Sequence, residues 1–557
     1  MKKIILALIA AFSLGTAGCG TLEAQISQNS DTSLEVSRAI QIFRDVLTGT
    51  AGLYVDTVDV RNITTLGINA MLSRLDPYTN YMPEVEKEDF DFMTTGEYAG
   101  IGAYIQQVDS IVYVSYPMPG SPAEKAGLLP GDAFLEVDGK DMIPSTAAKI
   151  SNTLKGPVGT QVNVKIRRNG ESDTRTFIIT RGNVTVDQVV YRGIFGDRIG
   201  FIRLSSFTSK SADDVRRAYQ ELTKDGPLKS LILDLRSNGG GVLDGAIDIL
   251  GMFLPKGTEV LTTKGKLPQT TQSYKTTREP VSTTLPLAVL INGGSASASE
   301  ILSGTLQDLD RAVLVGSKSF GKGLVQTTRP VSYDGLLKVT ISRYYIPSGR
   351  SIQQLDYSHR NPDGSVGAVP DSLTKVYHTK NGRPVRDGGG IRPDREVKDE
   401  VLSAPVYSML GEGEIFMYAR LLAKDKPKPA SLKEINITDE EFDAFLKFLE
   451  DRKFEYGKMS LKALEQLKEL ADFEGYEERS KAAFEALQKE LTPDLRKDVQ
   501  KDKEQIKSLL RAALAVYYFG MEGQFAVNLE SDRSIEEAVR ILSTPAEYKS
   551  ILSGDKK

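Results

Sequence analysis

The sequence predicts a multidomain α+β protein with an N-terminal helical segment, a β-rich domain, an α/β layered-sheet core and a C-terminal α-helical domain. Three observations predict this fold class. A chain of 557 residues is too long for one hydrophobic core. Its hydrophobic pattern changes near Gly96 from helical spacing to short alternating runs, and from about Val184 strands and helices alternate. Beyond about Glu400 the helical spacing returns.

Composition narrows the class of protein further. Hydrophobic residues make up 40% of the chain and charged residues 26%, so most of it is expected to fold as globular protein. The formal net charge is only −4, which gives no reason to expect nucleic-acid binding.

Residues 1–24 have the features of an export signal. Two lysines precede the apolar run 4–14, which is too short to span a bilayer and is typical of a signal peptide. The chain's single cysteine, Cys19, follows in a Thr-Ala-Gly-Cys sequence close to a bacterial lipoprotein processing site, where the cysteine is acylated. Thr16 departs from the aliphatic residue usual in such sites, and cleavage near Ala24 is the alternative. We expect an exported, periplasmic protein of the cell envelope whose only membrane attachment is a lipid anchor.

Residues 30–95 are expected to form an N-terminal helical segment. Its apolar residues recur at helical spacing without converging polar groups, which favours a helical collar or a homodimer contact over a chemical role. The residues that set this spacing are Val36, Ala39, Ile40, Phe43, Val46 and Leu47.

Residues 96–183 read as a small β-rich domain. Runs such as 111–114 and 162–166 alternate between apolar and polar residues, and Gly and Pro separate them. Three glycine-bearing motifs, at 98–103, 120–123 and 131–139, resemble the PDZ family over nearly the whole segment. In that family a loop exposes backbone N–H groups to a terminal carboxylate, and the adjacent strand edge accepts an extended peptide. The resemblance implies that the peptide-binding residues are Tyr98, Ala99, Gly100, Ile101 and Gly102.

Residues 184–397 alternate between strands and helices, which predicts a layered sheet. A strand is expected at 199–204, a helix at 211–222 and a buried strand at 231–235 that ends in Arg-Ser-Asn-Gly-Gly-Gly. Glycines at the end of a buried strand allow backbone N–H groups to approach a ligand, as an oxyanion hole requires. A tight turn between strand and helix is the alternative.

Three serines in the following strand-to-helix connection are candidate nucleophiles. Ser295, Ser297 and Ser299 alternate with alanines before Glu300, and a helix is expected at 301–309. The pattern fits a capping box that opens a helix, and it also fits a serine exposed at a strand-to-helix turn. Local reasoning does not choose among the three.

A serine nucleophile needs a base. His359 and His378 lie in a polar segment rich in Gly and Pro, so a Ser-His-Asp triad is poorly supported. Lys322, between two glycines, is the better candidate, because a lysine acts as a base when desolvation lowers its pKa. A hairpin lysine in water is the alternative. Residues 316–322 also fit the start of a phosphate-binding loop, but Gly323 and a strand follow instead of Ser or Thr and a helix, which argues against nucleotide binding.

The combination of a PDZ-like domain with the motifs at 233–241, 294–300 and 320–326 resembles the carboxyl-terminal processing proteases, a family of serine peptidases. The resemblance extends over about 35–397 and includes the segment 390–394 that closes the peptidase domain. It implies that Ser297 is the nucleophile, that Lys322 is the general base, and that Gln326 orients the lysine.

The resemblance also implies the supporting residues. The oxyanion donors would be the backbone N–H groups of Ala298 and Gly240, although Gly239 stands where the family usually has proline. Arg168 occupies the place of an arginine that couples peptide binding to activity in several relatives, with adjacent Arg167 as the alternative. No metal and no cofactor are required for this acyl-transfer chemistry.

The sequence therefore predicts an exported serine endopeptidase that acts on proteins with exposed, apolar C-terminal tails. The alternative is a non-catalytic PDZ adaptor on an inactive peptidase-like core, which would bind tails without turnover. Residues 400–557 are expected to form a separate α-helical domain, because their apolar residues recur at helical spacing and Lys and Glu fill the remaining positions.

Overall fold

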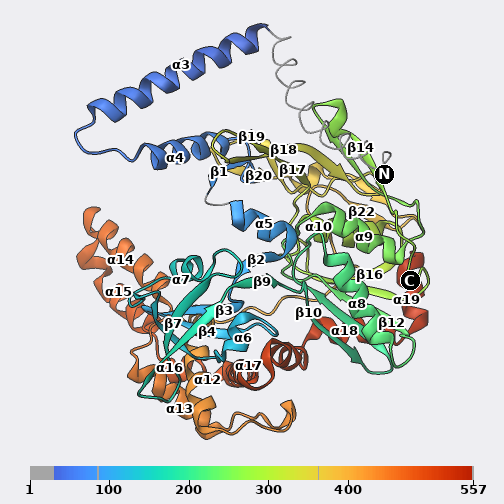
Figure 1. Cartoon of the computed structure of the whole chain (residues 1–557). Helices are drawn as coiled ribbons and strands as arrows, with labels where there is room; N and C mark the ends of the chain where they lie inside the picture. Colours follow the sequence, from blue (N-terminus) through green and yellow to red (C-terminus); the bar gives the residue numbers. More distant parts are fainter. Residues whose placement is uncertain (1–29, 85–86, 362, 555–557) are drawn as a thin grey trace. The chain divides into compact units, whose positions relative to one another are not determined.

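The computed structural model describes residues 30–84, 87–361 and 363–554 (Figure 1). The expected signal segment and Cys19 lie outside the described residues. The chain forms two compact units, one of residues 30–84 with 327–340 and one of residues 87–326 with 341–554. In the described ranges, no helix is long and apolar enough to cross a membrane.

The first unit contains the expected N-terminal helices. They are α3 (Ser30–Leu53) and α4 (Val60–Leu72), and the Asp59 side chain caps α4 by accepting the N–H of Asn62. A short strand, β1 (Asn80–Met82), was not predicted; it pairs antiparallel with residues 336–338 of β18 (Leu336–Tyr345). Asp76 turns the chain between α4 and β1, because its carboxylate accepts the N–H groups of Tyr78 and Thr79, each at 2.8 Å.

The second unit opens with helix α5 (Lys87–Thr95), which completes the expected helical segment, and continues into the β-rich domain. The sheet of this domain has the order β3-β4-β5-β7-β8, so β3 is an edge strand. Its buried core includes Phe134, Ile150 and Ile166. The strands are β3 (Ala103–Val108), β4 (Ile111–Pro117), β5 (Ala133–Val137), β6 (Lys140–Asp141), β7 (Gln161–Arg167) and β8 (Thr174–Thr180), and the helices are α6 (Pro122–Ala126) and α7 (Ala147–Leu154). A two-stranded ribbon of β2 (Glu97–Gly100) and β9 (Gly182–Thr185) joins its two ends.

The layered core is a six-stranded sheet with the order β10-β11-β12-β15-β16-β23. The strands pair in parallel except for the β10–β11 pair. The strands are β10 (Val189–Phe195), β11 (Ile199–Leu204), β12 (Ser230–Asp234), β15 (Leu287–Ile291), β16 (Ala312–Gly316) and β23 (Arg395–Glu396). This arrangement confirms the α/β sheet that the alternation of elements predicted.

The two faces of this sheet are covered by different parts of the chain. Side chains alternate between the faces along each strand. Leu287 and Val289 face a core formed with α8 (Ser211–Thr223), α9 (Leu243–Phe253) and α10 (Ala298–Asp308). Ala288 and Leu290 face the last helices of the chain, α18 (Arg533–Leu542) and α19 (Pro545–Ser553), through Ile535, Ala538, Ile541 and Tyr548.

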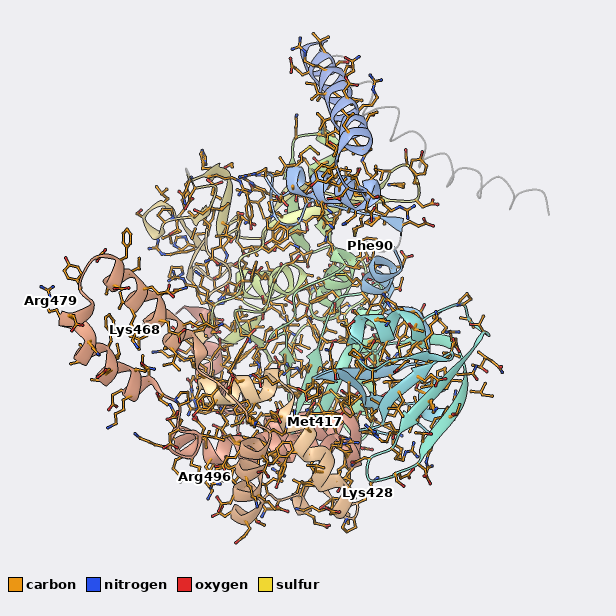
Figure 2. All side chains as sticks on the ribbon, turned by 90° about the vertical axis from the view of Figure 1, so that its left-hand side faces the viewer. Phe90, Met417, Lys428, Lys468, Arg479 and Arg496 are labelled. Atoms are coloured by element: carbon orange, nitrogen blue, oxygen red, sulfur yellow. The ribbon has the colours of Figure 1, made fainter. Side chains whose placement is uncertain are left out.

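The C-terminal region is helical, as predicted, but its packing divides it. One group of helices shares a core of its own that includes Phe445, Leu449 and Leu510. The helices of this region are α11 (Ala404–Gly411), α12 (Glu414–Asp425), α13 (Asp439–Asp451), α14 (Lys458–Phe473), α15 (Glu477–Leu491), α16 (Leu495–Asp498) and α17 (Lys503–Leu529). The hairpin of α14 and α15, on which Lys468 and Arg479 are labelled in Figure 2, projects from this group. Helices α18 and α19 instead complete the layered core, because their apolar faces bury the second face of its sheet.

Strands β13 (Glu259–Gly265), β14 (Gln272–Lys275) and β17 (Leu324–Pro330) belong with β18 to a smaller antiparallel sheet. Its part in the second unit consists of β13, β14 and residues 342–345 of β18. Strand β17, most of which belongs to the first unit, also pairs with β18. Two short hairpins follow, formed by β19 (Leu355–Arg360) with β20 (Val366–Ala368) and by β21 (Val376–His378) with β22 (Pro384–Arg386).

Candidate active site

Ser297 lies at the turn between β15 and α10. It is the N-cap residue of α10, so it opens the helix as the sequence predicted. Its φ of 56° and ψ of −112° are unusual for a residue with a side chain, and such strained turns present a side chain at the mouth of a site. Ser297 is half-buried, whereas Ala298 and Ser299 after it are buried.

The two neighbouring serines have structural roles. The Ser295 hydroxyl donates to the carbonyl oxygen of Leu235 at 2.8 Å, and the Ser299 hydroxyl donates to that of Asn238 at 2.8 Å. Both serine side chains are fully buried. They join the two strand-end turns, and Ser297 is the one serine of the three that is partly open to solvent.

Glu300 connects the serine turn to the lysine loop. Its Oε2 accepts the N–H of Ser297 at 2.9 Å and the N–H of Lys322 at 2.8 Å. Its Oε1 accepts the N–H of Gly321 at 2.7 Å and the hydroxyl of Ser319 at 2.6 Å. Because one carboxylate oxygen contacts both N–H groups, the backbones of Ser297 and Lys322 are held next to each other. Burial raises the pKa of Glu300 to about 7, although all four donors favour the ionised form.

A second side chain bridges the same two residues. The single O–H group of Tyr344, in β18, is shared between the carbonyl oxygen of Ser297, at 3.3 Å, and that of Lys322. Lys322 itself is half-buried. Gln326 is also half-buried, and it lies in β17, which begins two residues after Lys322. The predicted nucleophile and base therefore share two tethers, Glu300 and Tyr344.

The glycine turn after β12 packs directly against the serine turn. Gly240 has a φ of 101°, and a Cβ atom there would lie 2.8 Å from Cβ of Ser297 and 3.0 Å from the backbone nitrogen of Ala298. Only glycine fits this contact. The backbone nitrogen of Ala298 is at the first position of α10, where helix geometry offers no acceptor within the helix.

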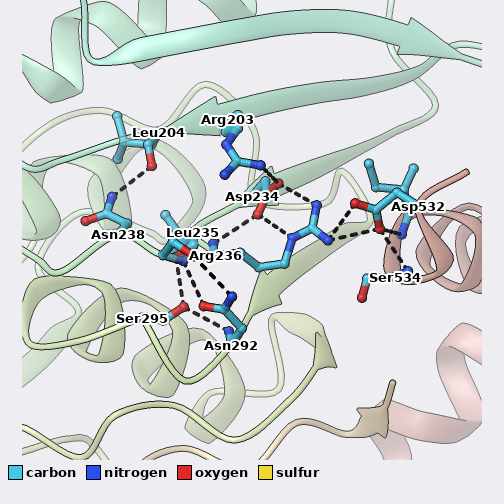
Figure 3. A network of polar contacts seen from close by, with 12 residues as sticks. Arg203, Leu204, Asp234, Leu235, Arg236, Asn238, Asn292, Ser295, Asp532 and Ser534 are labelled. Carbon is cyan, nitrogen blue, oxygen red and sulfur yellow. Dashed lines mark hydrogen bonds and ion pairs between the residues drawn. The ribbon is translucent and has the colours of Figure 1, made fainter. Parts of the chain in front are cut away.

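Asn238 fixes the shape of the glycine turn. Its Nδ2 donates to the carbonyl oxygen of Leu204 at 2.9 Å, as Figure 3 shows, and its Oδ1 accepts the N–H of Gly240 at 2.9 Å. Its own carbonyl oxygen accepts the N–H of Ala296 at 3.0 Å. The N–H of Gly240, the expected oxyanion donor, is thus directed at Asn238 in this structure, while the Cα of Gly240 faces Ser297.

The structure supports neither of the two histidines as the base nor a phosphate-binding loop at Lys322. His359 is 85% exposed and pairs with Asp356 at 2.7 Å, and His378 is exposed in β21, so neither supports a triad with the serine. Lys322 is followed by strand β17 and not by a helix, which agrees with the rejection of a phosphate-binding loop.

The predicted peptide-binding residues lie together at the start of the β-rich domain. Tyr98, Ala99 and Gly100 belong to β2, Ile101 is buried, and Gly102 has a φ of 77° just before edge strand β3. Burial raises the pKa of the Tyr98 hydroxyl to about 12, so it stays protonated at neutral pH.

Arg168 is held inside the β-rich domain. Its guanidinium forms a bidentate pair with Asp132, at 3.0 and 2.8 Å, and donates to the carbonyl oxygen of Gly127 at 2.7 Å. The Asp132 side chain is fully buried, and the Arg168 side chain is 15% exposed. Hydrogen bonding to Asp132 raises the pKa of Arg168.

Sequence reasoning missed three residues that shape the site. It assigned Glu300 to a helix cap, but the carboxylate also binds the lysine loop. It gave no role to Tyr344 or Asn238. Asn238 could have been predicted from its position between a buried strand and a glycine run, because a side-chain amide there can form hydrogen bonds with the backbone of its own turn.

Family models and relatives match this arrangement. The model of peptidase family S41 matches residues 198–363, a PDZ domain model matches 113–168, and the model "Probable PDZ-protease, C-terminal helical domain" matches 406–542. A carboxy-terminal-processing protease of Bartonella bacilliformis is 36% identical over 433 residues, which cover 74% of this chain and 97% of that protein. The chain belongs to the carboxyl-terminal processing proteases of family S41.

Other similar proteins carry the same description. A carboxyl-terminal-processing protease of Synechocystis is 36% identical over 321 residues, 57% of this chain and 72% of that protein. Among solved structures, the photosystem II D1 C-terminal processing protease is 29% identical, covers 64% of this chain and 87% of its own, and has a TM-score of 0.34. Membership of the family makes the chain a serine peptidase with a PDZ domain, which favours the enzyme over the non-catalytic adaptor.

Proposed function

We propose that this protease is exported, binds unstructured C-terminal tails through its PDZ domain and cleaves with a dyad of Ser297 and Lys322 supported by Gln326. One observation carries the dyad: the N–H groups of Ser297 and Lys322 donate to the same oxygen of Glu300. A base can take the proton of a nucleophile only when the two groups are adjacent. The Glu300 carboxylate holds the backbones of Ser297 and Lys322 next to each other.

The proposed reaction is acyl transfer. Neutral Lys322 takes the hydroxyl proton of Ser297, and the serine oxygen forms a bond to the carbonyl carbon of the scissile peptide. The N–H of Ala298 and an N–H of the glycine turn stabilise the oxyanion, which requires Gly240 to release Asn238 or a neighbouring glycine to donate instead. The carbon–nitrogen bond then breaks, and the leaving amine takes the proton from Lys322. In the second half, Lys322 takes a proton from water, the water oxygen forms a bond to the acyl carbon, the bond between that carbon and the Ser297 oxygen breaks, and Ser297 takes the proton back from Lys322.

Two alanine variants and a matched control test the dyad. Ser297→Ala and Lys322→Ala are expected to abolish cleavage of an unfolded protein with an apolar C-terminus, measured by mass spectrometry of the products. Lys318→Ala is the control, since Lys318 is another half-buried lysine four residues before Lys322 and is expected to leave the rate unchanged. Hydrolysis that survives in a purified Ser297→Ala or Lys322→Ala variant excludes the dyad.

The proposed binding of tails uses the free edge of the PDZ sheet. Strand β3 is an edge strand, and the loop with Ile101 and Gly102 precedes it, so a peptide could pair with β3 and place its carboxylate at the loop N–H groups. Binding of a peptide with a free carboxyl end, and not of the same peptide with an amidated end, is the expected result in a titration with the full chain.

Export and lipidation rest on the sequence alone. The apolar run 4–14 and Cys19 support a lipid-anchored periplasmic protein. Mass spectrometry of the mature N-terminus decides this point, since a lipid on Cys19 is expected and an unmodified terminus after Cys19 contradicts it.

A further inference from the structure

Arg236 begins the glycine turn and is clamped between two carboxylates. Its Nε and Nη2 donate to Asp234 at 2.9 and 2.8 Å, and its Nη1 donates to Asp532 at 2.9 Å (Figure 3). The Arg236 side chain is only 13% exposed. Asp234 ends strand β12 of the peptidase sheet, whereas Asp532 precedes helix α18 almost three hundred residues later in the chain.

The clamp is a nearly buried group of balanced charge. The Asp234 side chain is fully buried and also accepts from Arg203 at 3.2 Å. Two arginines therefore face two aspartates, and removal of the Asp532 charge leaves one excess positive charge at a buried site. Such a charge is costly, so the loss of Asp532 is expected to displace the Arg236 side chain toward water.

Asp532 is fixed by its own helix. It is the N-cap residue of α18, and its Oδ1 accepts the N–H groups of Ser534 and Ile535 at 3.0 and 3.1 Å. The helix is anchored in turn, because Ile535 and Ala538 pack on the peptidase sheet. Asp532 thus presents its second oxygen to Arg236 from a rigid position, at 2.7 Å from Nη1.

The clamp acts at the start of the turn that faces the nucleophile. The next residue, Ser237, has a φ of 58°, and its N–H donates to the side chain of Asn292 at 2.7 Å. Asn238 then bonds to Gly240, which lies against Ser297. A shift of Arg236 would therefore be transmitted through Ser237 and Asn238 to Gly240, the proposed oxyanion donor of this turn.

We propose that Asp532 is a positioning residue of the peptidase: from helix α18 it fixes Arg236, and through Arg236 it fixes the glycine turn opposite Ser297. The inference rests on the proposed function, since it assumes that this turn stabilises the oxyanion. It assigns the end of the C-terminal region a direct part in the catalytic geometry.

Two substitutions separate this role from helix capping. Asp532→Asn keeps a good N-cap and removes the charge, whereas Asp532→Glu keeps the charge and weakens the cap. If the ion pair positions the turn, Asp532→Asn lowers kcat by about ten- to a hundredfold with little change in KM, and Asp532→Glu retains more activity. If Asp532 only caps α18, the order is reversed, and that result overturns the proposal.

The experiment uses the full chain with an unfolded protein substrate and records kcat, KM and thermal unfolding. Glu547→Gln is the control, because Glu547, at the start of α19, also pairs with arginines, Arg395 and Arg540, and neither arginine belongs to the turn. Its kcat is expected to equal that of the parent. A kcat of Asp532→Asn equal to that of the parent also overturns the proposal. If Ser297→Ala cleaved the substrate as fast as the parent, the proposed function would be contradicted. Failure of the proposed function is therefore distinguishable from failure of the proposed role of Asp532.

Discussion

Replacement of Glu300 by glutamine tests how the site is assembled. The carboxylate accepts four donors, two at each oxygen, but an amide has only one oxygen. The best arrangement keeps the carbonyl oxygen on Ser297 and Lys322 and turns the NH₂ group toward Ser319, whose hydroxyl can accept a hydrogen bond. The N–H of Gly321 then faces another donor and loses its acceptor.

The magnitude is at least that of this one buried N–H group, because the Ser319 hydroxyl also loses the Glu300 oxygen to which it donates. An unsatisfied buried donor costs about 1–3 kcal/mol, so Glu300→Gln is expected to lower the free energy of unfolding by at least that amount. Displacement of the lysine loop is expected to lower kcat by about ten- to a hundredfold. Urea unfolding and the rate of cleavage at saturating substrate measure the two effects, and Glu279→Gln, at an exposed ion pair with Lys256, is the control.

The pH dependence of the parent gives an independent test. The pKa of Glu300 is raised from 4.5 to about 7, so between these values the folded protein binds this proton more tightly than the unfolded chain does. The contribution of this group to stability is fully present below pH 4.5 and is lost as the pH rises through about 7. Activity follows the opposite course, because the protonated acid has fewer acceptors for the lysine loop, and kcat is expected to fall as the pH drops below about 7.

Glutamine does not titrate, so Glu300→Gln is expected to lose the part of the acid limb that Glu300 contributes near pH 7, whereas protonation of Lys322 still lowers kcat in acid. A variant that keeps the parent kcat at alkaline pH with unchanged stability would show that the Glu300 carboxylate does not hold the lysine loop. An acid limb identical to that of the parent would show that ionisation of Glu300 does not affect kcat.

Three further predictions concern other parts of the molecule. Termination of the chain after Leu529 removes α18 and α19, exposes one apolar face of the peptidase sheet and is expected to give an insoluble or expanded protein in size-exclusion chromatography; a compact soluble product contradicts this. Asn238→Ala leaves the N–H of Gly240 without its acceptor. The variant is expected to lose about 1–3 kcal/mol of stability in urea unfolding and to have a lower kcat. Unchanged values would show that the turn does not need this amide. Arg168→Ala leaves the buried Asp132 carboxylate without its guanidinium partner and is expected to destabilise the PDZ domain by about 3–5 kcal/mol. Faster hydrogen exchange in the strands of this domain would detect the loss. Exchange equal to that of the parent would mean that water replaces the guanidinium.

The fold was largely predictable because local patterns determine it. A strand was predicted at 199–204 and a buried strand at 231–235, and the structure places these strands at Ile199–Leu204 and Ser230–Asp234. Helical spacing likewise predicted 211–222, found as Ser211–Thr223. The packing of α18 and α19 could not be predicted in the same way. Amphipathic helices seek an apolar face, but their sequence does not say which of several faces they cover.

The site was predictable only in part. The pattern of alternating serines offered three candidates, and burial of Ser295 and Ser299 against neighbouring turns distinguishes Ser297 in a way that spacing cannot. Glu300 has one partner three residues before it, which the capping-box pattern predicts, and others more than twenty residues after it, which no local pattern predicts. Long-range hydrogen bonds depend on the tertiary fold, so local sequence patterns could not predict them.

The way in which the chain's last helices complete the core affects when the enzyme can become active during its synthesis. A growing chain emerges from its N-terminal end, and the strands of the peptidase sheet precede α18 by more than a hundred residues. Until α18 and α19 have emerged, Ala288 and Leu290 have no cover, and Arg236 has no partner at Asp532. The active geometry proposed for this peptidase therefore requires that α18 has been synthesised, and a nascent chain that has not reached α18 is expected not to cleave neighbouring unfolded chains.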